Sequence, residues 1–194
     1  MEILILCKQL CECSPFMNSP SCTVIIYNWG DFMQPYSIRE VSSKDIDCLL
    51  RLMRDFSRVL GKSHRFTTNA STLESALAID GFIHALIIET DSPIGYALFY
   101  DIYSSFSGKK SIYLEDLYIA PSSQKRGYGQ ILIAEIARRA VRLGYESIEW
   151  ICSEHNHNAL GFYKSIGAKT NSEFILHELD KESINEFLDK ILND

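Results

Sequence analysis

The stretch that most constrains this chain is residues 120–136, APSSQKRGYGQILIAEI, in which Gln124, Gly127 and Gly129 have the spacing QxxGxG between an apolar strand and an amphipathic helix. Glycine lets the backbone approach a ligand closely, and the first N–H groups of a helix lack acceptors within it. Those amides and the positive end of the helix dipole favour a bound anion. The pattern predicts a pyrophosphate-binding loop, with a helix start that merely contains glycines as the alternative.

Two common nucleotide-binding loops do not fit this stretch. A P-loop continues after its last glycine with Lys and then Ser or Thr, whereas Gly129 is followed by Gln130 and Ile131. A dinucleotide-binding loop needs a third glycine, and position 132 is Leu. The phosphate that this loop would bind therefore belongs to another class of cofactor.

Composition is that of a globular domain. The chain has 194 residues, 46% hydrophobic and 23% charged, enough for one core but not for two large domains. No apolar run is long enough to span a membrane, and a net charge of −6 disfavours nucleic-acid binding. Glu2 and Lys8 argue against a signal peptide. We expect a cytoplasmic protein, with a poorly ordered N-terminal extension over residues 1–35 and one domain over 36–194.

Four cysteines, Cys7, Cys11, Cys13 and Cys22, lie within the first 22 residues. A metal site is the alternative interpretation, but no histidine lies near them and their spacing is not that of a zinc finger. We expect reduced thiols and no bound metal. His155 and His157 flank Asn156 and are interpreted as loop residues.

Periodicity and turn residues predict an α/β domain. Helices are expected from the Ser42 and Asp45 cap to Gly61, from Ser71 onward, and over residues 127–143, 159–165 and 181–192. Strands are expected over residues 36–41, 82–89, 94–103, 111–119, 147–152 and 173–179.

Three segments in order carry a family resemblance: residues 113–119 (YLEDLYI), the QxxGxG loop, and Asn156 and Ala159 with residues 162–168 (FYKSIGA). Together they resemble the GNAT superfamily of N-acetyltransferases, and within it the diamine (spermidine/spermine) acetyltransferases, including thialysine acetyltransferase-like members. The resemblance covers about residues 36–179. It implies the GNAT fold, a central mixed twisted sheet of about six to seven strands flanked by helices. It also implies acetyl-CoA as cosubstrate, no metal, and a homodimer.

The chemistry of amine acetylation calls for a base and an acid. A lysine-type amine has a pKa of about 10.4, so freeing its lone pair at pH 7 costs about 4 to 5 kcal/mol. The resemblance implies Glu115 as that base and Tyr163 as the acid that protonates the departing thiolate. A paired strand carboxylate and a core aromatic are the respective alternatives. Asp116 is expected on the face opposite Glu115 because strand side chains alternate, and both acids are candidate substrate-binding residues.

The resemblance also assigns the acetyl-CoA contacts. A backbone amide near residues 117–119 is expected to donate to the acetyl carbonyl. Three arginines, at 138, 139 and 142, either serve the anionic cofactor or form a solvated helix face. The candidate cofactor-binding residues are Leu117, Tyr118, Ile119, Gln124, Lys125, Arg126, Gly127, Tyr128, Gly129, Gln130, Asn156 and Tyr163.

Two segments expected to meet the substrate differ from those of the diamine acetyltransferases. Diamine acetyltransferases are acidic after their first helix and between their third and fourth strands, where this chain has residues 61–66 (GKSHRF) and 104–109 (SSFSGK). Glu115, Asp116 and Asp101 remain as possible ammonium partners. We expect acetylation of a small primary amine, a diamine or a thialysine-like amino acid, in a ternary complex. A protein lysine or N-terminal acetyltransferase and a non-catalytic acyl-CoA-binding module are the alternatives.

Overall fold

The structure is a computed structural model that describes residues 24–26, 34–79 and 81–192. The N-terminal cysteines and most of the predicted extension lie outside these ranges. The chain divides into two compact units, residues 1–151 and 152–194, and each is described by itself. Within the described residues, no helix combines the length and apolar character needed to cross a membrane.

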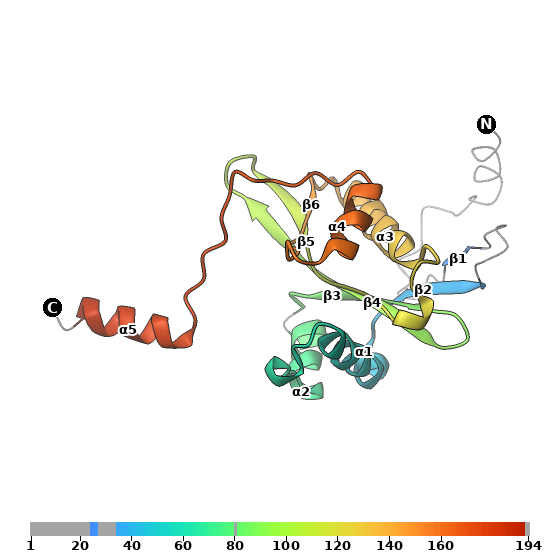
Figure 1. The fold of residues 1–194 in the computed structure, drawn as a ribbon, viewed down its shortest axis with the longest axis horizontal. Helices are drawn as coiled ribbons and strands as arrows, with labels where there is room; N and C mark the ends of the chain where they lie inside the picture. Colours follow the sequence, from blue (N-terminus) through green and yellow to red (C-terminus); the bar gives the residue numbers. More distant parts are fainter. Residues whose placement is uncertain (1–23, 27–33, 80, 193–194) are drawn as a thin grey trace. The chain divides into compact units, whose positions relative to one another are not determined.

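The first unit contains a mixed sheet of six strands in sequence order (Figure 1). Neighbouring strands are antiparallel from β1 to β5, and β6 runs parallel to β5. The strands are β1 (Val24–Ile26), β2 (Tyr36–Glu40), β3 (His84–Glu89), β4 (Pro93–Ser104), β5 (Lys109–Ile119) and β6 (Ile148–Glu149). This confirms the predicted α/β class and its mixed sheet. Strand β1 lies within the segment assigned to the extension and was not predicted.

Two predicted strands differ in the structure. The strand expected over residues 147–152 is reduced to the two residues of β6. The strand expected over 173–179 does not form, and its apolar side chains Phe174, Ile175 and Leu176 are exposed. A strand is stable only when another strand accepts its hydrogen bonds, and the described part of the second unit contains helices but no strand. The sheet is therefore at the lower end of the expected strand count.

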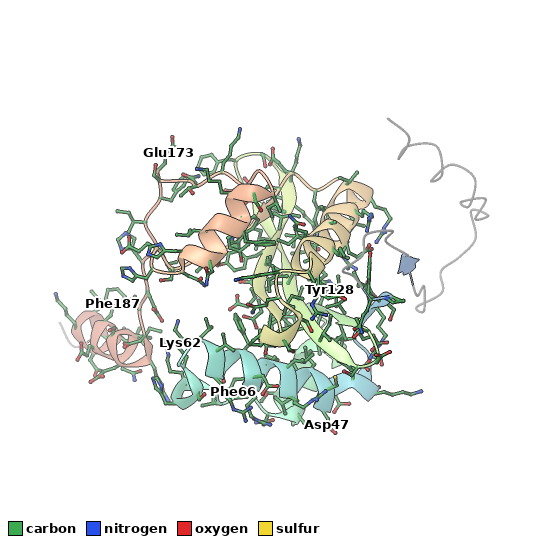
Figure 2. All side chains as sticks on the ribbon, turned by 45° about the vertical axis from the view of Figure 1, so that its right-hand side comes forward. Asp47, Lys62, Phe66, Tyr128, Glu173 and Phe187 are labelled. Atoms are coloured by element: carbon green, nitrogen blue, oxygen red, sulfur yellow. The ribbon has the colours of Figure 1, made fainter. Side chains whose placement is uncertain are left out.

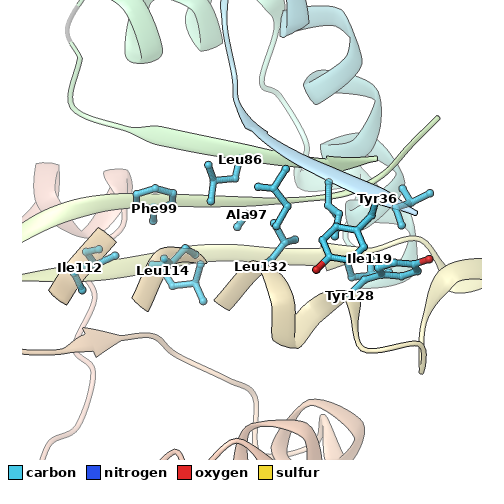
Figure 3. Packing of buried hydrophobic residues seen from close by; sticks show 14 residues of the cluster. Tyr36, Leu86, Ala97, Phe99, Ile112, Leu114, Ile119, Tyr128 and Leu132 are labelled. Carbon is cyan, nitrogen blue, oxygen red and sulfur yellow. The ribbon is translucent and has the colours of Figure 1, made fainter. Parts of the chain in front are cut away.

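Helices cover both faces of the sheet (Figure 1). On one face, α1 (Ile46–Val59) and α2 (Ala70–Glu74) bury Leu49 and Leu73 against β3 and β4. On the other face lies α3 (Tyr128–Leu143). Figure 3 shows Tyr128 and Leu132 of this helix in one buried cluster with side chains of β2, β3, β4 and β5, such as Tyr36, Leu86, Ala97 and Ile112.

Local hydrogen bonds determine where these helices begin. Ser42 and Asp45 form the predicted capping box, but a 3₁₀ turn at Ser43–Asp45 precedes α1. Helix α2 begins one residue before the predicted Ser71, because Asn69 accepts a hydrogen bond from the backbone of Thr72 at 3.0 Å and caps the helix. A π-helical turn over Ser75–Ile79 follows it. Figure 2 shows Lys62 beyond the end of α1 and Phe66 alongside the helix, where Arg54 lies 5.7 Å from the centroid of the Phe66 ring.

The second unit contributes two helices, α4 (His157–Ser165) and α5 (Lys181–Leu192). Both agree with the prediction, although α4 begins two residues earlier than expected. Asn156 is the cap of α4, and its side chain accepts a hydrogen bond from the backbone of Ala159 at 3.1 Å.

Candidate active site

The loop after β5 has the backbone of an anion-binding nest. A 3₁₀ turn at Pro121–Ser123 leads into Lys125 at φ 61° and Gly127 at φ 85°, both left-handed. Left-handed residues interspersed in a turn direct successive N–H groups into one concavity, which suits an anion. A residue with a side chain, such as Lys125, seldom adopts this conformation, and such outliers cluster at functional sites. The phosphate loop predicted from sequence therefore has the required backbone.

Gln124 keeps this loop against the sheet. Its side-chain amide donates a hydrogen bond to the carbonyl oxygen of Ile119, the last residue of β5, at 2.9 Å. This hydrogen bond fixes the start of the loop relative to the strand. The contact between Gln124 and the cofactor stays a prediction.

The start of α3 leaves backbone donors free. The first backbone bond of the helix runs from Ile131 to the carbonyl of Gly127 at 3.1 Å, so the amides of residues 128–130 have no acceptor within the helix. Tyr128 offers only this amide, because its ring is buried in the core, edge-on to Tyr36 with 6.1 Å between ring centroids (Figure 3). A contact of its side chain with a cofactor is incompatible with that burial.

The basic residues of this region divide into two groups. Lys125 and Arg126 are exposed in the loop itself. Arg138 and Arg139 lie about 15 Å further along the helix at 1.5 Å per residue. Arg138 pairs with Glu135 at 2.7 Å and Arg139 with Glu40 at 2.8 Å. Lys125 and Arg126 therefore lie in the predicted phosphate loop, whereas Arg138 and Arg139 form ion pairs further along the helix.

Strand β5 contains a β-bulge at Glu115. Leu98 of β4 lies opposite Asp116, and the next residue, Phe99, lies opposite Leu114, so Glu115 has no partner on β4. An extra residue of this kind breaks the alternation of side chains along a strand. The prediction that Glu115 and Asp116 point to opposite faces is therefore wrong.

Two tyrosines of β4 show that both carboxylates lie on the α1 face. Tyr96 donates a hydrogen bond to Oδ2 of Asp116 at 2.8 Å, and Tyr100 donates to Oε2 of Glu115 at 3.5 Å. Tyr96 and Tyr100 are four residues apart on a strand and point the same way, into the cluster under α1. The sequence analysis missed both tyrosines, because only the pairing of β4 with β5 reveals them.

The surroundings of the two acids differ. Glu115 is exposed, whereas Asp116 is partly buried. Burial raises the pKa of Asp116, the hydrogen bond from Tyr96 lowers it, and the charge of Glu115 raises it again, with a net rise. Burial and the neighbouring Asp116 raise the pKa of Tyr96, so its hydroxyl remains protonated and keeps donating at neutral pH.

Asp101, the third candidate ammonium partner, does not lie with Glu115 and Asp116. It accepts a hydrogen bond from Tyr145 and forms an ion pair with Lys110 at 3.4 Å. Tyr145 packs against the core under α3, on the sheet face opposite to Glu115 and Asp116. Asp101 is therefore a paired structural carboxylate.

The outer edge of β5 is open beside these acids. Strand β6 pairs with β5 only at Ile112 and Tyr113, so residues 114–119 have no strand partner on that side among the described residues. The other side of the strand is closely packed, since a Cβ at Gly95 would lie 2.4 Å from the carbonyl oxygen of Tyr118. The side chains of Tyr118 and Ile119 are buried, so these residues can offer a ligand only backbone groups.

The second unit holds Tyr163 and Asn156. Burial, with a smaller contribution from Cys152, raises the pKa of Tyr163 to about 12. The rings of Phe162 and Tyr163 lie 5.3 Å apart on α4. Asn156 acts as the helix cap described above, and its contact with the cofactor stays a prediction. His155 is exposed beside Glu154, and the described residues contain no group of three or more metal-ligating side chains.

Comparison with known proteins assigns the family. The model of the acetyltransferase (GNAT) family matches residues 49–168, and the chain belongs to this family. The family is that of acetyl-CoA-dependent N-acetyltransferases, as predicted from the sequence motifs.

Named relatives are enzymes that act on amines. The thialysine N-epsilon-acetyltransferase of Sus scrofa is 30% identical over 150 residues, which are 70% of this chain and 85% of that protein. The L-ornithine N5-acetyltransferase of Arabidopsis thaliana is 34% identical over 97 residues, or 50% of this chain and 42% of that protein.

Solved structures share the fold. An integron cassette protein of V. cholerae superposes with a TM-score of 0.68 at 18% identity, over 78% of this chain and 96% of that chain. An aminoglycoside acetyltransferase from a soil metagenome, in complex with trehalose, has a TM-score of 0.66 at 20% identity. The match covers 75% of this chain and 97% of that chain.

Proposed function

We propose that this protein transfers the acetyl group of acetyl-CoA directly to a small primary amine. The observation that carries the proposal is the pair of acids on β5: the bulge brings Glu115 and Asp116 to one face of the strand that leads into the phosphate nest. A primary amine arrives as an ammonium ion at neutral pH, and adjacent carboxylates attract it.

The proposed reaction moves two protons off the nitrogen and one onto the sulfur. The ammonium loses a proton to Glu115, directly or through water, and its nitrogen then attacks the acetyl carbon. The tetrahedral intermediate loses the second nitrogen proton to water and collapses by breaking the C–S bond, while Tyr163 donates its proton to the leaving sulfur and regains one from solvent. With its pKa raised to about 12, the Tyr163 phenol is fully protonated at neutral pH and available as a donor. These roles follow from the positions of both residues in the family motifs.

The cofactor role of the loop completes the proposal. The amides of residues 128–130, the nest around Lys125 and the side chain of Arg126 would bind the pyrophosphate of acetyl-CoA. Backbone groups on the open edge of β5 would meet the pantetheine arm and the acetyl carbonyl. We also propose a cytoplasmic location and a homodimer, and sedimentation of the purified protein would test the homodimer.

The amine is proposed to be an amino acid with a side-chain amine. The relatives named as thialysine and L-ornithine acetyltransferases support this choice. The segment after α1 supports it too, since Lys62 and Arg65 provide positive charge where polyamine enzymes are acidic. A carboxylate-bearing substrate is compatible with these cations, and a polycation is repelled by them.

Release of CoA across a panel of amines tests the proposal. We expect turnover with thialysine or L-ornithine, weaker turnover with spermidine and spermine, and little with lysine-containing peptides. Fast acetylation of peptides alone would favour the protein acetyltransferase. Tight binding of acetyl-CoA without CoA release for any amine would favour a non-catalytic binding module.

A further inference from the structure

The bond between Tyr96 and Asp116 is unusual for a core contact. Tyr96 is fully buried between α1 and the sheet, at 0% exposure, and its hydroxyl donates to Asp116 at 2.8 Å. A buried tyrosine usually donates to a backbone carbonyl or a neutral group, where no charge is brought into the core. Here it supports a carboxylate whose burial is itself unfavourable.

The two acids of the bulge also lack a cation. Within the part of the chain that the structure describes, neither Glu115 nor Asp116 forms an ion pair, whereas the strand acids Glu89 and Asp101 pair with Arg39 and Lys110. Two neighbouring carboxylates without a counterion repel one another, and a bound cation removes that cost. The pair is thus prepared for a positively charged ligand.

We propose that Tyr96 is a positioning residue, whose hydroxyl holds the Asp116 carboxylate beside Glu115 so that the two acids together receive the ammonium group of the amine substrate. The inference rests on the proposed function and deepens it. A primary ammonium has three N–H donors, and the hydrogen bond from Tyr96 occupies one oxygen of Asp116 and leaves the other to accept. Tyr96 itself does not reach the substrate; it acts through Asp116.

The groups around this pair are tyrosines and acids. Tyr100 of β4 and Tyr113 and Tyr118 of β5 face the same side of the sheet, and burial, followed by Asp55 of α1, raises the pKa of Tyr118. The tyrosine hydroxyls are neutral at pH 7, so the charge that meets an incoming ammonium comes from carboxylates. Among the described residues, the hydroxyl of Tyr96 donates the hydrogen bond that lowers the pKa of Asp116 and so helps this carboxyl to stay ionised.

Tyr96→Phe tests this role. We expect the KM of the variant for thialysine to rise about tenfold, the effect of one lost hydrogen bond to a charged group. The KM for acetyl-CoA should stay unchanged. Without the donor, the pKa of Asp116 rises, so the variant should lose affinity for thialysine at a higher pH than wild type as the solution is acidified. Calorimetry of thialysine binding to the CoA complex, at several pH values, measures this shift.

A matched control is available on the other face of the sheet. Tyr145→Phe also removes a phenol that donates to an aspartate, Asp101, and should leave both KM values and the pH dependence unchanged. Asp116→Asn removes the charge of the carboxylate that Tyr96 is proposed to hold in place. This variant can be measured if Tyr96→Phe fails to fold. The double variant should be no worse than Asp116→Asn alone, because both changes remove one interaction.

The outcomes separate this inference from the proposed function. Turnover of thialysine or L-ornithine by wild type, with Tyr96→Phe unchanged in amine KM and pH dependence, overturns the positioning role alone. Effects of Tyr96→Phe and Asp116→Asn that multiply in the double variant overturn it too. If wild type releases no CoA with any amine, the proposed function fails, and the inference fails with it.

Discussion

Asp116 and Asp45 are both aspartates with little exposure in the first unit, yet their surroundings move their pKa values in opposite directions. Burial raises the pKa of each carboxyl, but at Asp45 hydrogen bonds from Ser42 and the guanidinium of Arg39, 2.7 Å away, outweigh burial and lower it. At Asp116 burial prevails. The charged form of Asp45 therefore stabilises the fold, whereas that of Asp116 destabilises it.

Asp116→Asn is predicted to stabilise the protein at pH 7, while amine binding is lost. The folded protein binds the Asp116 proton more tightly than the unfolded chain does. Stability is therefore lost as pH rises from about 3.9 through the folded pKa, and the asparagine variant escapes this loss. Urea unfolding at pH 7 and pH 4 measures the difference, which should shrink at the lower pH.

Asp45→Asn is the control for this experiment. Its carboxylate contributes stability above about pH 3.9, so the variant should be less stable than wild type at pH 7 and should approach it as pH falls through the folded pKa. If Asp116→Asn also destabilised the protein at pH 7, the carboxylate of Asp116 would belong to a stabilising network.

Glu115→Gln should lower kcat/KM most near neutral pH, where the substrate amine is protonated. Raising the pH towards the pKa of the amine, about 10.4, should recover part of the loss, because the free amine no longer needs a base. Steady-state kinetics from pH 6.5 to about 9.5 measure both effects. Glu40→Gln, which changes another exposed strand glutamate, should leave the profile unaltered. A uniform loss at every pH would point to substrate binding instead of proton transfer.

Tyr163→Phe keeps the ring of Tyr163 and removes its hydroxyl. We expect kcat to fall by about 10², the range of a lost general acid, with acetyl-CoA affinity retained. Single-turnover kinetics and calorimetry separate the two quantities. A kcat close to that of wild type would assign Tyr163 to packing on α4, beside Phe162.

At the scale of elements, α3 has a left-handed glycine at each end: Gly127 at φ 85° before it and Gly144 at φ 69° after it. Alanine at either position would lower the free energy of unfolding by about 1–2 kcal/mol, because an L-residue is strained in the left-handed conformation. Gly127→Ala should also weaken acetyl-CoA binding, because it distorts the nest. Gly144→Ala should reduce stability to a similar extent but leave acetyl-CoA affinity intact. Thermal unfolding and calorimetry on both variants test this. If both variants bound acetyl-CoA with the same affinity, the start of α3 would not be the cofactor site.

The elements that could be predicted are those with a strong local signal. Helices α1 and α3 and the central strands β3, β4 and β5 have clear periodicity and turn residues, and the glycine spacing predicted where the loop between β5 and α3 ends and the helix begins. The bulge at Glu115 could not be predicted, because it depends on the register between β4 and β5. The same register is needed to bring Tyr96 to Asp116. Residues 173–179 have the composition of a strand, but a strand also needs a partner.

At the scale of the whole molecule, the family motifs are distributed over both units. Glu115 and the phosphate loop belong to residues 1–151, and Asn156 and Tyr163 to residues 152–194. A ligand that binds only the folded protein stabilises it by about 2.7 kcal/mol at 100 times its Kd. We expect acetyl-CoA to raise the unfolding temperature of wild type, and Gly127→Ala to require a higher concentration for the same increase. Differential scanning fluorimetry over a concentration series measures this.

The short pairing of β6 has a consequence for exchange with solvent. Beyond Ile112 and Tyr113, the edge of β5 faces no neighbouring strand among the described residues, so backbone amides that point outwards there exchange freely with D₂O. A bound pantetheine arm, which carries its own amide groups, would take the place of the absent strand. Deuterium uptake at residues 114–119 should then slow when acetyl-CoA is added, and the cosubstrate would act as the last strand of the sheet.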